Sequence, residues 1–419
     1  MIKRILFNEL KSHLSKREIS LIVGPRQSGK TTLMLLLKDF LIKNGERVIF
    51  LNLDVEADRN YFLSQSKLIS KIQLEIGKNK GFVFIDEIQR KEDAGLFLKG
   101  IYDLNLPYKF IVSGSGSIEL KEKIHESLVG RKRIFELTTL TFEEFVNFKT
   151  GYKYENSLNE FFEVENDKVK EIFQEYLYFG GYPRIALAES ISEKQLEMNE
   201  IYQSYLEKDI SFLLNIQKTE EISNLVKILA SQIGKLTNFS ELSNTLRLSN
   251  QTLRKYLWYL EKTFIINKIT PFFKNVRKEI TKSPVYYFYD LGLRNYSLGL
   301  FRRFGEIYDI GFIFQNFIFN ILRDTLKTSS VAINFWRTLD KAEVDFVISP
   351  GIEIFPIEVK YKFLKNPVIG RSLRNFIAKY NPKKAFVVNF NYESTIKINN
   401  TEVFFLTYRK VTNFFNLLQ

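Results

Sequence analysis

The first third of the chain alternates short apolar runs with segments of helical periodicity. The apolar runs are rich in β-branched and aromatic residues, and polar or glycine-containing turns follow them. Continuous runs of this length are typical of strands buried on both faces of a parallel sheet. We therefore predict an α/β fold here, with strands at residues 19–23, 48–53, 82–85, 110–113 and 133–137.

The middle of the chain is mainly helical in pattern. Residues 150–170 are polar and acidic, which is typical of a connector, and the helical stretch continues to about residue 232. Gly-Gly-Tyr-Pro at 180–183 interrupts it with a turn signal. We expect this stretch to form a helical lid that packs over the domain in front of it.

Two short amphipathic helices follow within residues 236–266. Asn238 is a candidate N-cap of the first helix, with Glu241 three residues later, and Ser249 is a candidate cap of the second. A hairpin with Lys and Arg at its tip is expected at 275–282. Two short helices, a tight turn and a hairpin predict a winged helix-turn-helix.

A second alternation of helix and strand begins near residue 300. Helices are predicted at 312–326 and 372–380, and strands at 331–336, 344–348, 354–360 and 385–390. This pattern indicates a second α/β domain. The chain is thus expected to consist of four parts, at residues 1–150, 151–235, 236–298 and 299–419.

A glycine loop joins the first predicted strand to a predicted helix. Its sequence, Gly-Pro-Arg-Gln-Ser-Gly-Lys-Thr, fits G-x4-G-K-[ST]. The glycines let the backbone curl so that successive N–H groups face a phosphate. Lys30 can reach the β- and γ-phosphates, and the Thr31 hydroxyl can bind Mg²⁺. We predict an ATP site formed by Gly24, Pro25, Arg26, Gln27, Ser28, Gly29, Lys30, Thr31 and Thr32.

The third predicted strand ends in paired acids, Asp86 and Glu87. A parallel strand places such acids at the edge of the sheet where ligands bind. We expect Asp86 to hold Mg²⁺ and Glu87 to polarise the attacking water. The hydroxyls of Ser113 and Ser115 can bond to the γ-phosphate or to that water, although a turn after a strand explains each serine equally well.

A basic run, Gly-Arg-Lys-Arg at 130–133, lies just before the fifth predicted strand. In an ATPase, an arginine here can reach the γ-phosphate of a neighbouring subunit and stabilise charge in the transition state. A solvated basic face is the commoner explanation of such a run. Arg131 is therefore a candidate residue that acts on the ATP of a neighbouring subunit. This role implies a homo-oligomer such as a ring.

Acids and a lysine recur on the predicted strands of the rear domain. Glu343 and Asp345 share one face of a strand, and Glu358 and Lys360 share one face of the next, because side chains alternate along a strand. Neighbouring strands can bring Asp345, Glu358 and Lys360 together. Two carboxylates bind Mg²⁺, and a lysine positions or activates a hydrolytic water. These three residues form a candidate nuclease site.

The charge is unevenly distributed along the chain. Residues 1–235 carry 34 Lys/Arg and 34 Asp/Glu, whereas residues 236–419 carry 27 and 14, a difference equal to the whole net charge of +13. A one-sided excess favours a polyanionic partner. We expect nucleic acid, DNA foremost, with possible contacts from Asn250, Gln251, Arg254 and Lys255. A winged helix that serves only as a packing module remains the alternative.

Composition excludes several classes of protein. The chain has no cysteine and only two histidines, His13 and His125, so thiolate catalysis, disulfides and cysteine zinc sites are excluded. No apolar run approaches the roughly 18 residues of a membrane span. The first residues show no signal-peptide pattern. We expect a cytoplasmic location and no membrane contact.

Several segments, in this order, carry a resemblance to a known family. GPRQSGKTT, FVFIDEIQ, IVSGSGS, an L-x-GR element followed by TLTFEEF, and FGGYPR resemble the prokaryotic AAA+ ATPases that end in a nuclease-like domain. The resemblance covers nearly the whole chain. It implies ATP binding and hydrolysis by Lys30, Thr31, Asp86 and Glu87, a polar sensor near Ser115, and assembly into a ring or with a partner.

The rear domain resembles the PD-(D/E)XK nuclease fold, through AEVDFVI and IEVKY. The resemblance leads us to expect a glutamate on the first helix of that domain, where this chain has Gln315. A neutral amide is a poorer Mg²⁺ ligand than a carboxylate, although Glu343 could compensate. A nuclease-like shape is therefore better supported than nuclease activity.

Three functions follow from this sequence. The first is an AAA+ ATPase whose nucleotide state moves a basic, nucleic-acid-binding rear half with a degenerate nuclease-like domain. The second is an ATP-dependent nuclease that uses Asp345, Glu358 and Lys360. The third is a nucleotide-driven signalling or defence switch that binds protein partners. Salt-dependent DNA binding separates the third from the first two.

Overall fold

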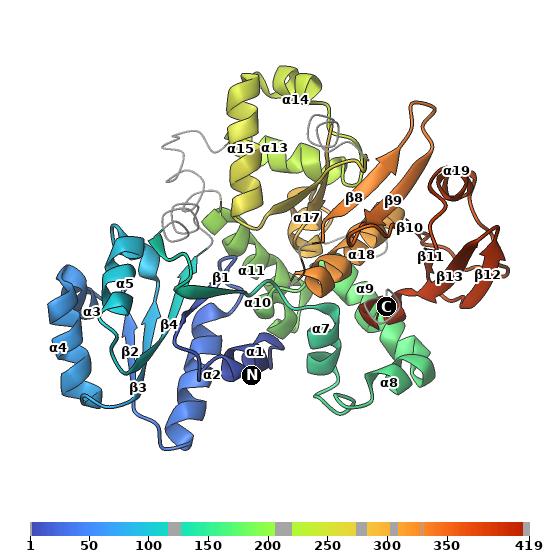
Figure 1. Cartoon of the computed structure of the whole chain (residues 1–419). Helices are drawn as coiled ribbons and strands as arrows, with labels where there is room; N and C mark the ends of the chain where they lie inside the picture. The colour runs from blue at the N-terminus through green and yellow to red at the C-terminus, as the bar shows by residue number, and fades with distance from the viewer. Residues whose placement is uncertain are drawn as a thin grey trace. The chain divides into compact units, whose positions relative to one another are not determined.

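The computed structural model describes residues 2–115, 127–205, 220–273, 283–301, 309–327, 329 and 331–413. The chain divides into two compact units (Figure 1). Unit 1 comprises Met1–Leu140, Tyr182–Thr219 and Leu257–Ile265, and unit 2 comprises Thr141–Gly181, Glu220–Tyr256 and Ile266–Gln419. The predicted helical stretch 151–235 is thus shared between the units, and the four-part division of the chain stays a prediction.

Unit 1 is built on a five-stranded parallel sheet in the order β2-β3-β4-β1-β5. Every residue of β1 and β3 is buried, which explains why these strands read as continuous apolar runs. The strands are β1 (Ile19–Gly24), β2 (Val48–Asn52), β3 (Gly81–Asp86), β4 (Tyr108–Ser115) and β5 (Lys132–Glu136). The α/β fold predicted for this region is confirmed.

Two helices cover one face of this sheet. Leucines of α1 (Leu6–Ser12) and α2 (Lys30–Lys43) pack against side chains of β1, β3, β4 and β5 in one buried cluster. The remaining helical segments of unit 1 are α3 (Glu56–Arg59), η1 (Asn60–Leu63), α4 (Gln65–Ile76), η2 (Ile88–Arg90), α5 (Ala94–Asp103), α10 (Pro183–Leu187) and α11 (Ile191–Gln203). Of these, α3, η1 and α4 link β2 to β3, and η2 and α5 link β3 to β4, as a parallel sheet requires.

Unit 2 contains a mixed six-stranded sheet in the order β12-β13-β11-β10-β9-β8. Its strands are β8 (Ile333–Arg337), β9 (Glu343–Ile348), β10 (Phe355–Val359), β11 (Lys384–Asn389), β12 (Ser394–Ile398) and β13 (Thr401–Thr407). β10, β11 and β13 run parallel, and the other neighbours pair antiparallel. The sheet extends by two strands, β12 and β13, beyond those predicted from the sequence.

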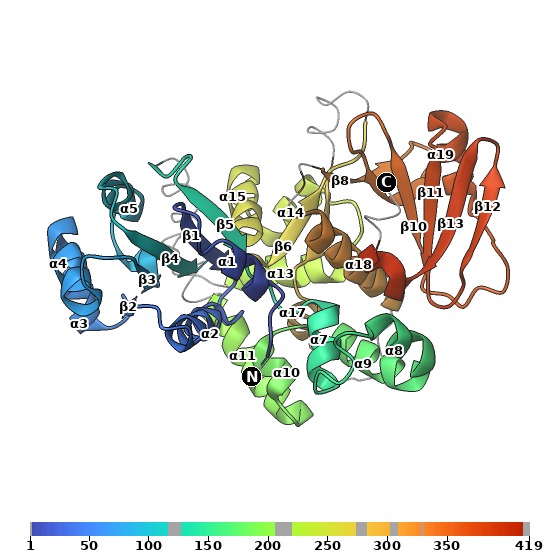
Figure 2. The same cartoon turned by 60° about the horizontal axis from the view of Figure 1, so that its bottom comes forward.

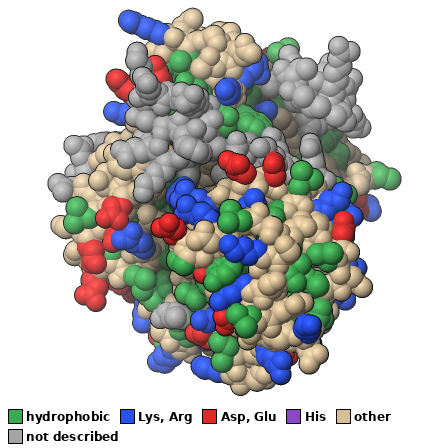
Figure 3. Space-filling view, turned by 90° about the vertical axis from the view of Figure 1, so that its left-hand side faces the viewer, with side chains coloured by type: hydrophobic (Ala, Val, Ile, Leu, Met, Phe, Trp, Pro, Cys, Tyr) green, Lys and Arg blue, Asp and Glu red, His purple; other side chains and the backbone are tan. Residues whose placement is uncertain are grey.

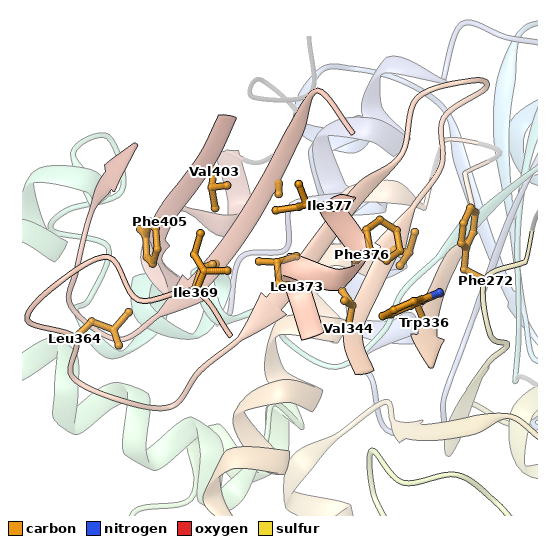
Figure 4. Packing of buried hydrophobic residues seen from close by; sticks show 13 residues of the cluster. Phe272, Trp336, Val344, Leu364, Ile369, Leu373, Phe376, Ile377, Val403 and Phe405 are labelled. Carbon is orange, nitrogen blue, oxygen red and sulfur yellow. The ribbon is translucent and has the colours of Figure 1, made fainter. Parts of the chain in front are cut away.

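Helices α18 (Ile310–Leu326) and α19 (Arg371–Tyr380) pack on opposite faces of this sheet. Val347 lies in a buried cluster with Leu373 and Phe376 of α19 (Figure 4). The adjacent Phe346 instead contacts Phe319 of α18, with ring centroids 6.0 Å apart. Successive residues of a strand point to opposite faces, so the two contacts place one helix on each side.

Two helices and a small sheet occupy the region predicted as a winged helix-turn-helix. They are α14 (Phe239–Leu246), α15 (Asn250–Lys262) and the antiparallel pair β6 (Ile266–Ile269) and β7 (Val285–Phe288). The Asn238 side chain accepts hydrogen bonds from the N–H groups of Ser240 and Glu241, as an N-cap should. The predicted hairpin 275–282 lies outside the described residues, so the winged helix stays a prediction.

Helices α7 (Phe142–Lys149), α8 (Leu158–Val164) and α9 (Asn166–Phe179) of unit 2 lie side by side (Figure 2). Phe173 of α9 contacts Phe317 of α18 and stacks on Tyr408, with ring centroids 5.1 and 4.3 Å apart. Asp290 caps α17 and also accepts a hydrogen bond from the N–H of Gly181. Also in unit 2 are α13 (Glu220–Ser231), α17 (Leu291–Ser297) and η4 (Tyr408–Asn413).

Basic, acidic and hydrophobic side chains are interspersed on the face of the molecule in Figure 3. No field of a single sign of charge covers this face. Within the described ranges, no helix is both long and apolar enough to cross a bilayer.

Candidate functional site

The glycine loop of unit 1 leaves the middle of the sheet at the carboxyl end of β1. Gly24 ends the strand, and a Cβ added there would lie 2.0 Å from the carbonyl oxygen of Leu137, so only glycine fits. Gly29 has φ +93° and precedes α2, a conformation that L side chains rarely adopt. The two glycines therefore shape the loop that aims its N–H groups and the start of α2 at one point.

Lys30 lies inside this loop. The side chain is buried, and its ammonium donates hydrogen bonds to the carbonyl oxygens of Gly24 (3.1 Å) and Pro25 (2.8 Å). The positive charge is thus held at the curl of the backbone. This is where the phosphates of a nucleotide would lie according to the sequence pattern.

Thr31 and Asp86 meet beside the loop. The Thr31 hydroxyl donates to Asp86 Oδ2 at 2.7 Å, and the Ser113 hydroxyl donates to Asp86 Oδ1. Asp86 is only 1% exposed. A hydroxyl and a carboxylate are hard oxygen donors, and Mg²⁺ at a nucleotide takes one or two protein carboxylates together with phosphates and waters. The residues present therefore fit a Mg²⁺ ion bound with a nucleotide.

Glu87 follows Asp86 in a left-handed conformation, with φ +58°. Its N–H donates to Asp86 Oδ1 and to the Ser113 hydroxyl, and the Gln89 amide donates to Glu87 Oε2. Burial raises the pKa of the Glu87 carboxyl, and the nearby Lys30 opposes that rise. A raised pKa brings a carboxylate closer to neutral pH, where it works best as a general base.

Four residues have roles in this site that were not predicted from the sequence. Ser113 was expected at the phosphate or the water, but it orients Asp86. Gln89, Arg4 and Arg184 were not expected in the site at all. Arg4 donates to the carbonyl oxygens of Ser28 and Thr138, and Arg184 donates to Gln27 Oε1 at 3.3 Å. Arg184 and Gln89 are the last residues of the quoted segments FGGYPR and FVFIDEIQ, whereas nothing in the sequence indicated Arg4.

The other predicted residues of the loop and of β4 have different surroundings. Pro25 and Ser28 are buried, Arg26 is partly buried, and Thr32 is exposed. The Ser28 hydroxyl is buried without a hydrogen-bond partner. Ser115 is the last residue of β4, and its side chain lies outside the described part of the structure.

Arg131 lies at the opposite edge of the sheet from the glycine loop. Its carbonyl oxygen accepts a hydrogen bond from the N–H of Ile19 at the start of β1, whereas the loop follows the end of that strand. The guanidinium pairs with Asp103, with Nε 2.8 Å from Oδ1. Arg131 is therefore not part of the phosphate site of its own chain, and a role in a neighbouring subunit's site stays a prediction.

A second polar cluster lies in unit 2, where β9, β10 and α18 meet. The Gln315 amide donates to Asp345 Oδ1 at 2.8 Å, and the N–H of Val359 donates to Asp345 Oδ2 at 2.6 Å. Lys360 Nζ lies 3.4 Å from Glu358 Oε1. Desolvation by burial raises the pKa of Asp345 to about 7. Gln315 thus contacts Asp345, and the charges of Glu358 and Lys360 lie close enough to Asp345 to affect its pKa.

This cluster is poor in carboxylates. Glu343, the residue considered as a substitute for the missing acid, pairs with Arg337 at 2.9 Å. Among the described residues, no group of three His, Cys, Asp or Glu side chains is placed to hold a metal ion. Both oxygens of Asp345 already accept hydrogen bonds from protein donors.

The residues proposed to contact DNA lie together on α15. Asn250, Gln251, Arg254 and Lys255 are exposed. The Arg254 guanidinium stacks over the Phe239 ring, 4.5 Å from its centroid. DNA contact by these four residues stays a prediction.

Three family profiles match successive parts of the chain. Residues 16–146 match an AAA domain, residues 170–303 match a domain of unknown function (DUF8612), and residues 310–408 match a second domain of unknown function (DUF4143). The first range contains the glycine loop and the Asp86–Glu87 pair. Residues 16–146 are thus a P-loop domain of the AAA type, which confirms that part of the sequence interpretation.

Curated relatives are similar over most of this chain. An uncharacterized protein of Haemophilus influenzae is 25% identical over 403 residues, which cover 93% of each chain. Uncharacterized protein Rv2008c of Mycobacterium tuberculosis is 26% identical over 369 residues, 87% of this chain and 75% of the relative. Uncharacterized protein MJ1544 of Methanocaldococcus jannaschii is 25% identical over 350 residues, 82% and 75% of the two chains.

Solved structures with a similar arrangement include two that contain DNA. The Orc1 protein of Aeropyrum pernix in complex with DNA is 11% identical, covers 73% of this chain and 94% of its own, and has a TM-score of 0.29. The replication initiator DnaA bound to AMPPCP and single-stranded DNA is 15% identical, with coverages of 61% and 86% and a TM-score of 0.28. At TM-scores this low, neither likeness bears on the ligands of this chain.

Proposed function

We propose that unit 1 binds and hydrolyses ATP with Mg²⁺, and that the nucleotide state controls a nucleic-acid-binding rear half of the chain. The observation that carries the proposal is the pair formed by the Thr31 hydroxyl and Asp86 Oδ2, next to the buried ammonium of Lys30. The match of residues 16–146 to an AAA domain supports the same assignment.

The residues divide the chemistry between them. Lys30 supplies positive charge to the β- and γ-phosphates, and charged phosphate oxygens are stronger acceptors than the two carbonyls that hold it in the structure. Thr31 and Asp86 would hold Mg²⁺, which when bound neutralises charge on the phosphates. Ser113 fixes the orientation of Asp86.

Glu87 is the residue that we assign to the attacking water. Its carboxylate orients the water and accepts a proton from it as the oxygen attacks the γ-phosphate. The Gln89 amide fixes one carboxylate oxygen, so the other is left for the water. Arg131, which points away from this site, is assigned to the γ-phosphate of a neighbouring copy, and this role requires a homo-oligomer.

The nucleic-acid part of the proposal is supported by charge. The whole net charge of +13 arises from residues 236–419. Such an excess attracts phosphate backbones and makes binding dependent on salt. The rival function, a metal-dependent nuclease, is favoured by the gathering of Asp345, Glu358 and Lys360. Gln315 beside Asp345 opposes it, because a neutral amide is a poorer Mg²⁺ ligand than a carboxylate.

One binding experiment tests the coupling. The affinity of the full chain for labelled oligonucleotides is measured at low salt with ATP, with ADP and without nucleotide, for the wild type and for Lys30→Ala. We expect affinities that differ several-fold between ATP and ADP in the wild type and not in Lys30→Ala. Equal affinities in every wild-type state would contradict the coupling, and no binding at low salt would favour a switch that binds protein partners.

A further inference from the structure

The longest stretch of the rear half without an acidic residue is also rich in basic residues. Residues 359–392 contain eight Lys or Arg and no Asp or Glu. This stretch runs from the end of β10 through a long connection into α19 and then into β11. Much of the excess charge is thus carried by one small part of unit 2.

The connection between β10 and α19 is fixed in place by two buried side chains. Leu364 and Ile369, 8% and 5% exposed, pack into the cluster between α19 and the sheet (Figure 4). The Asn391 side chain accepts a hydrogen bond from the N–H of Leu364 (2.9 Å) and donates one to its carbonyl oxygen (3.2 Å). The residues between these anchors are therefore presented outward on an ordered backbone.

Phe363, which directly precedes the anchor Leu364, is 64% exposed. Its ring lies 4.8 Å, centroid to centroid, from the buried ring of Phe390. Both rings line a pocket of about 550 Å³, together with Asn166, Asn391 and Arg409. This volume falls in the range of small-ligand pockets. The two aromatic rings offer a stacking surface for a planar base, while Arg409 donates a hydrogen bond to Asn166 Oδ1 at the wall of the pocket.

The basic side chains of the connection and of the first residue of α19 are available to an anion. Lys362, Lys365 and Arg371 are exposed, and within the described ranges none of them forms an ion pair. Three acids, Glu163, Asp167 and Glu393, and three basic residues line the pocket, and Lys410 pairs with Glu393 at 2.7 Å and with Glu163 at 3.8 Å. The surroundings of Phe363 therefore attract negative charge, while the pocket itself is close to neutral.

We propose that this aromatic-basic surface, formed by Lys362, Phe363, Lys365, Arg371 and Phe390, binds single-stranded nucleic acid. A base stacks on Phe363 in the pocket, and the phosphates on either side contact the three basic side chains. An exposed ring can reach the face of a base only where that base is unstacked, which excludes an intact duplex. The inference rests on the proposed nucleic-acid function. It adds which surface binds the nucleic acid and that the nucleic acid is single-stranded.

The test measures binding of labelled oligo(dT), oligo(rU) and a blunt DNA duplex to the full chain over a range of salt concentrations. We expect Phe363→Ala to weaken binding of the single strands about fivefold or more, as loss of one stacked base does. The salt dependence should not change, since no charge is lost. Phe363→Trp should restore affinity, which excludes a folding defect.

The basic residues should behave differently. Each of Lys362→Ala, Lys365→Ala and Arg371→Ala should lower the slope of log affinity against log salt by about 0.7, the value for one phosphate contact on a single strand. Ile352→Ala and Lys397→Ala serve as matched controls, because both residues are exposed in the same unit. Neither control should change the affinity or the slope.

The outcomes separate this inference from the function on which it rests. If the wild type binds no oligonucleotide at low salt, the nucleic-acid function itself fails. If it binds but Phe363→Ala matches the wild type, only the assignment of this surface fails. Equal affinities for the duplex and the single strands would also overturn the assignment. So would an acidic polypeptide that binds as tightly as the single strands and loses affinity in Phe363→Ala to the same extent.

Discussion

The Thr31 hydroxyl donates a hydrogen bond of 2.7 Å to Asp86 Oδ2, which joins the first turn of α2 to the end of β3. These residues are 55 positions apart in the sequence. The parallel order β3-β4-β1 brings their strands to the same edge of the sheet. The pair is thus in place within unit 1 through protein contacts alone, and its two oxygens suit the same cation.

Loss of the Asp86 charge should remove hydrolysis. We expect Asp86→Asn to lower kcat for ATP about 100-fold or more, because an amide holds Mg²⁺ poorly and charge on the phosphates is left uncompensated. Steady-state phosphate release at saturating ATP and Mg²⁺ measures this. Asp39→Asn, which changes an exposed acid on α2, is the control and should retain wild-type turnover.

Glu87→Gln should separate binding from hydrolysis. Glutamine keeps the shape of the side chain but cannot accept the proton of the attacking water. We expect a loss of turnover of about 100-fold with nearly unchanged affinity for a fluorescent ATP analogue. Wild-type turnover in this variant would exclude Glu87 as the base, and lost affinity would indicate a structural role instead.

Gln89 should set the pH at which Glu87 works. The hydrogen bond from Gln89 lowers the pKa of Glu87, against the larger effect of burial, which raises it. Gln89→Leu removes the bond, so the pKa of Glu87 rises and the carboxylate becomes protonated at higher pH. The acidic limb of the profile of kcat against pH should move upward. An unmoved limb would show that another group controls it.

His13 should make unit 1 less stable in acid. Burial, and then the positive charge of Lys109, lowers the pKa of His13 to about 4, whereas an unfolded histidine titrates near 6.5. Between these values the unfolded chain binds more protons, so the free energy of unfolding falls as pH decreases, by up to about 1.4 kcal/mol per pH unit. Thermal melting at pH 7.5 and 5.5 should therefore differ more for the wild type than for His13→Gln.

The protonation of His13 can also be observed directly. The chain has only two histidines, so His125→Gln leaves His13 as the only imidazole in an NMR titration. We expect its signals to stay those of a neutral ring down to about pH 5, since its Nδ1 is bonded to the Ser20 hydroxyl inside the sheet. A midpoint near 6.5 would contradict the buried environment.

The sequence predicted the strands of unit 1 well because buried parallel strands carry a strong local signal. It failed for β12, whose residues Ser394–Ile398 alternate between partly buried and exposed positions at the edge of the sheet. The roles of Ser113, Arg4 and Gln89 were also missed. Each depends on contacts with residues far along the chain or on the turn after Asp86, and neither spacing nor composition reveals such contacts.

From the sequence, Gln315 was the position at which the predicted nuclease site lacks an acid. The structure shows which residue this amide contacts instead. The Gln315 amide donates to Asp345 Oδ1. It therefore lies where the nuclease resemblance leads us to expect a metal-binding glutamate. We expect Gln315→Glu to remove this donor and to place a second carboxylate beside Asp345. Because like charges disfavour ionisation, the pKa of Asp345, already raised to about 7 by burial, should rise further.

This change predicts a gain of metal binding. Without a divalent cation, Gln315→Glu should melt at lower temperature than the wild type, since two buried carboxylates repel each other. Added Mn²⁺ should restore its melting temperature and shift that of the wild type little, because ligands that bind the folded state stabilise it. The double variant Gln315→Glu/Asp345→Asn is the control and should not respond. Equal Mn²⁺ shifts in the wild type and in Gln315→Glu would show that the amide does not prevent metal binding, and would favour the nuclease instead.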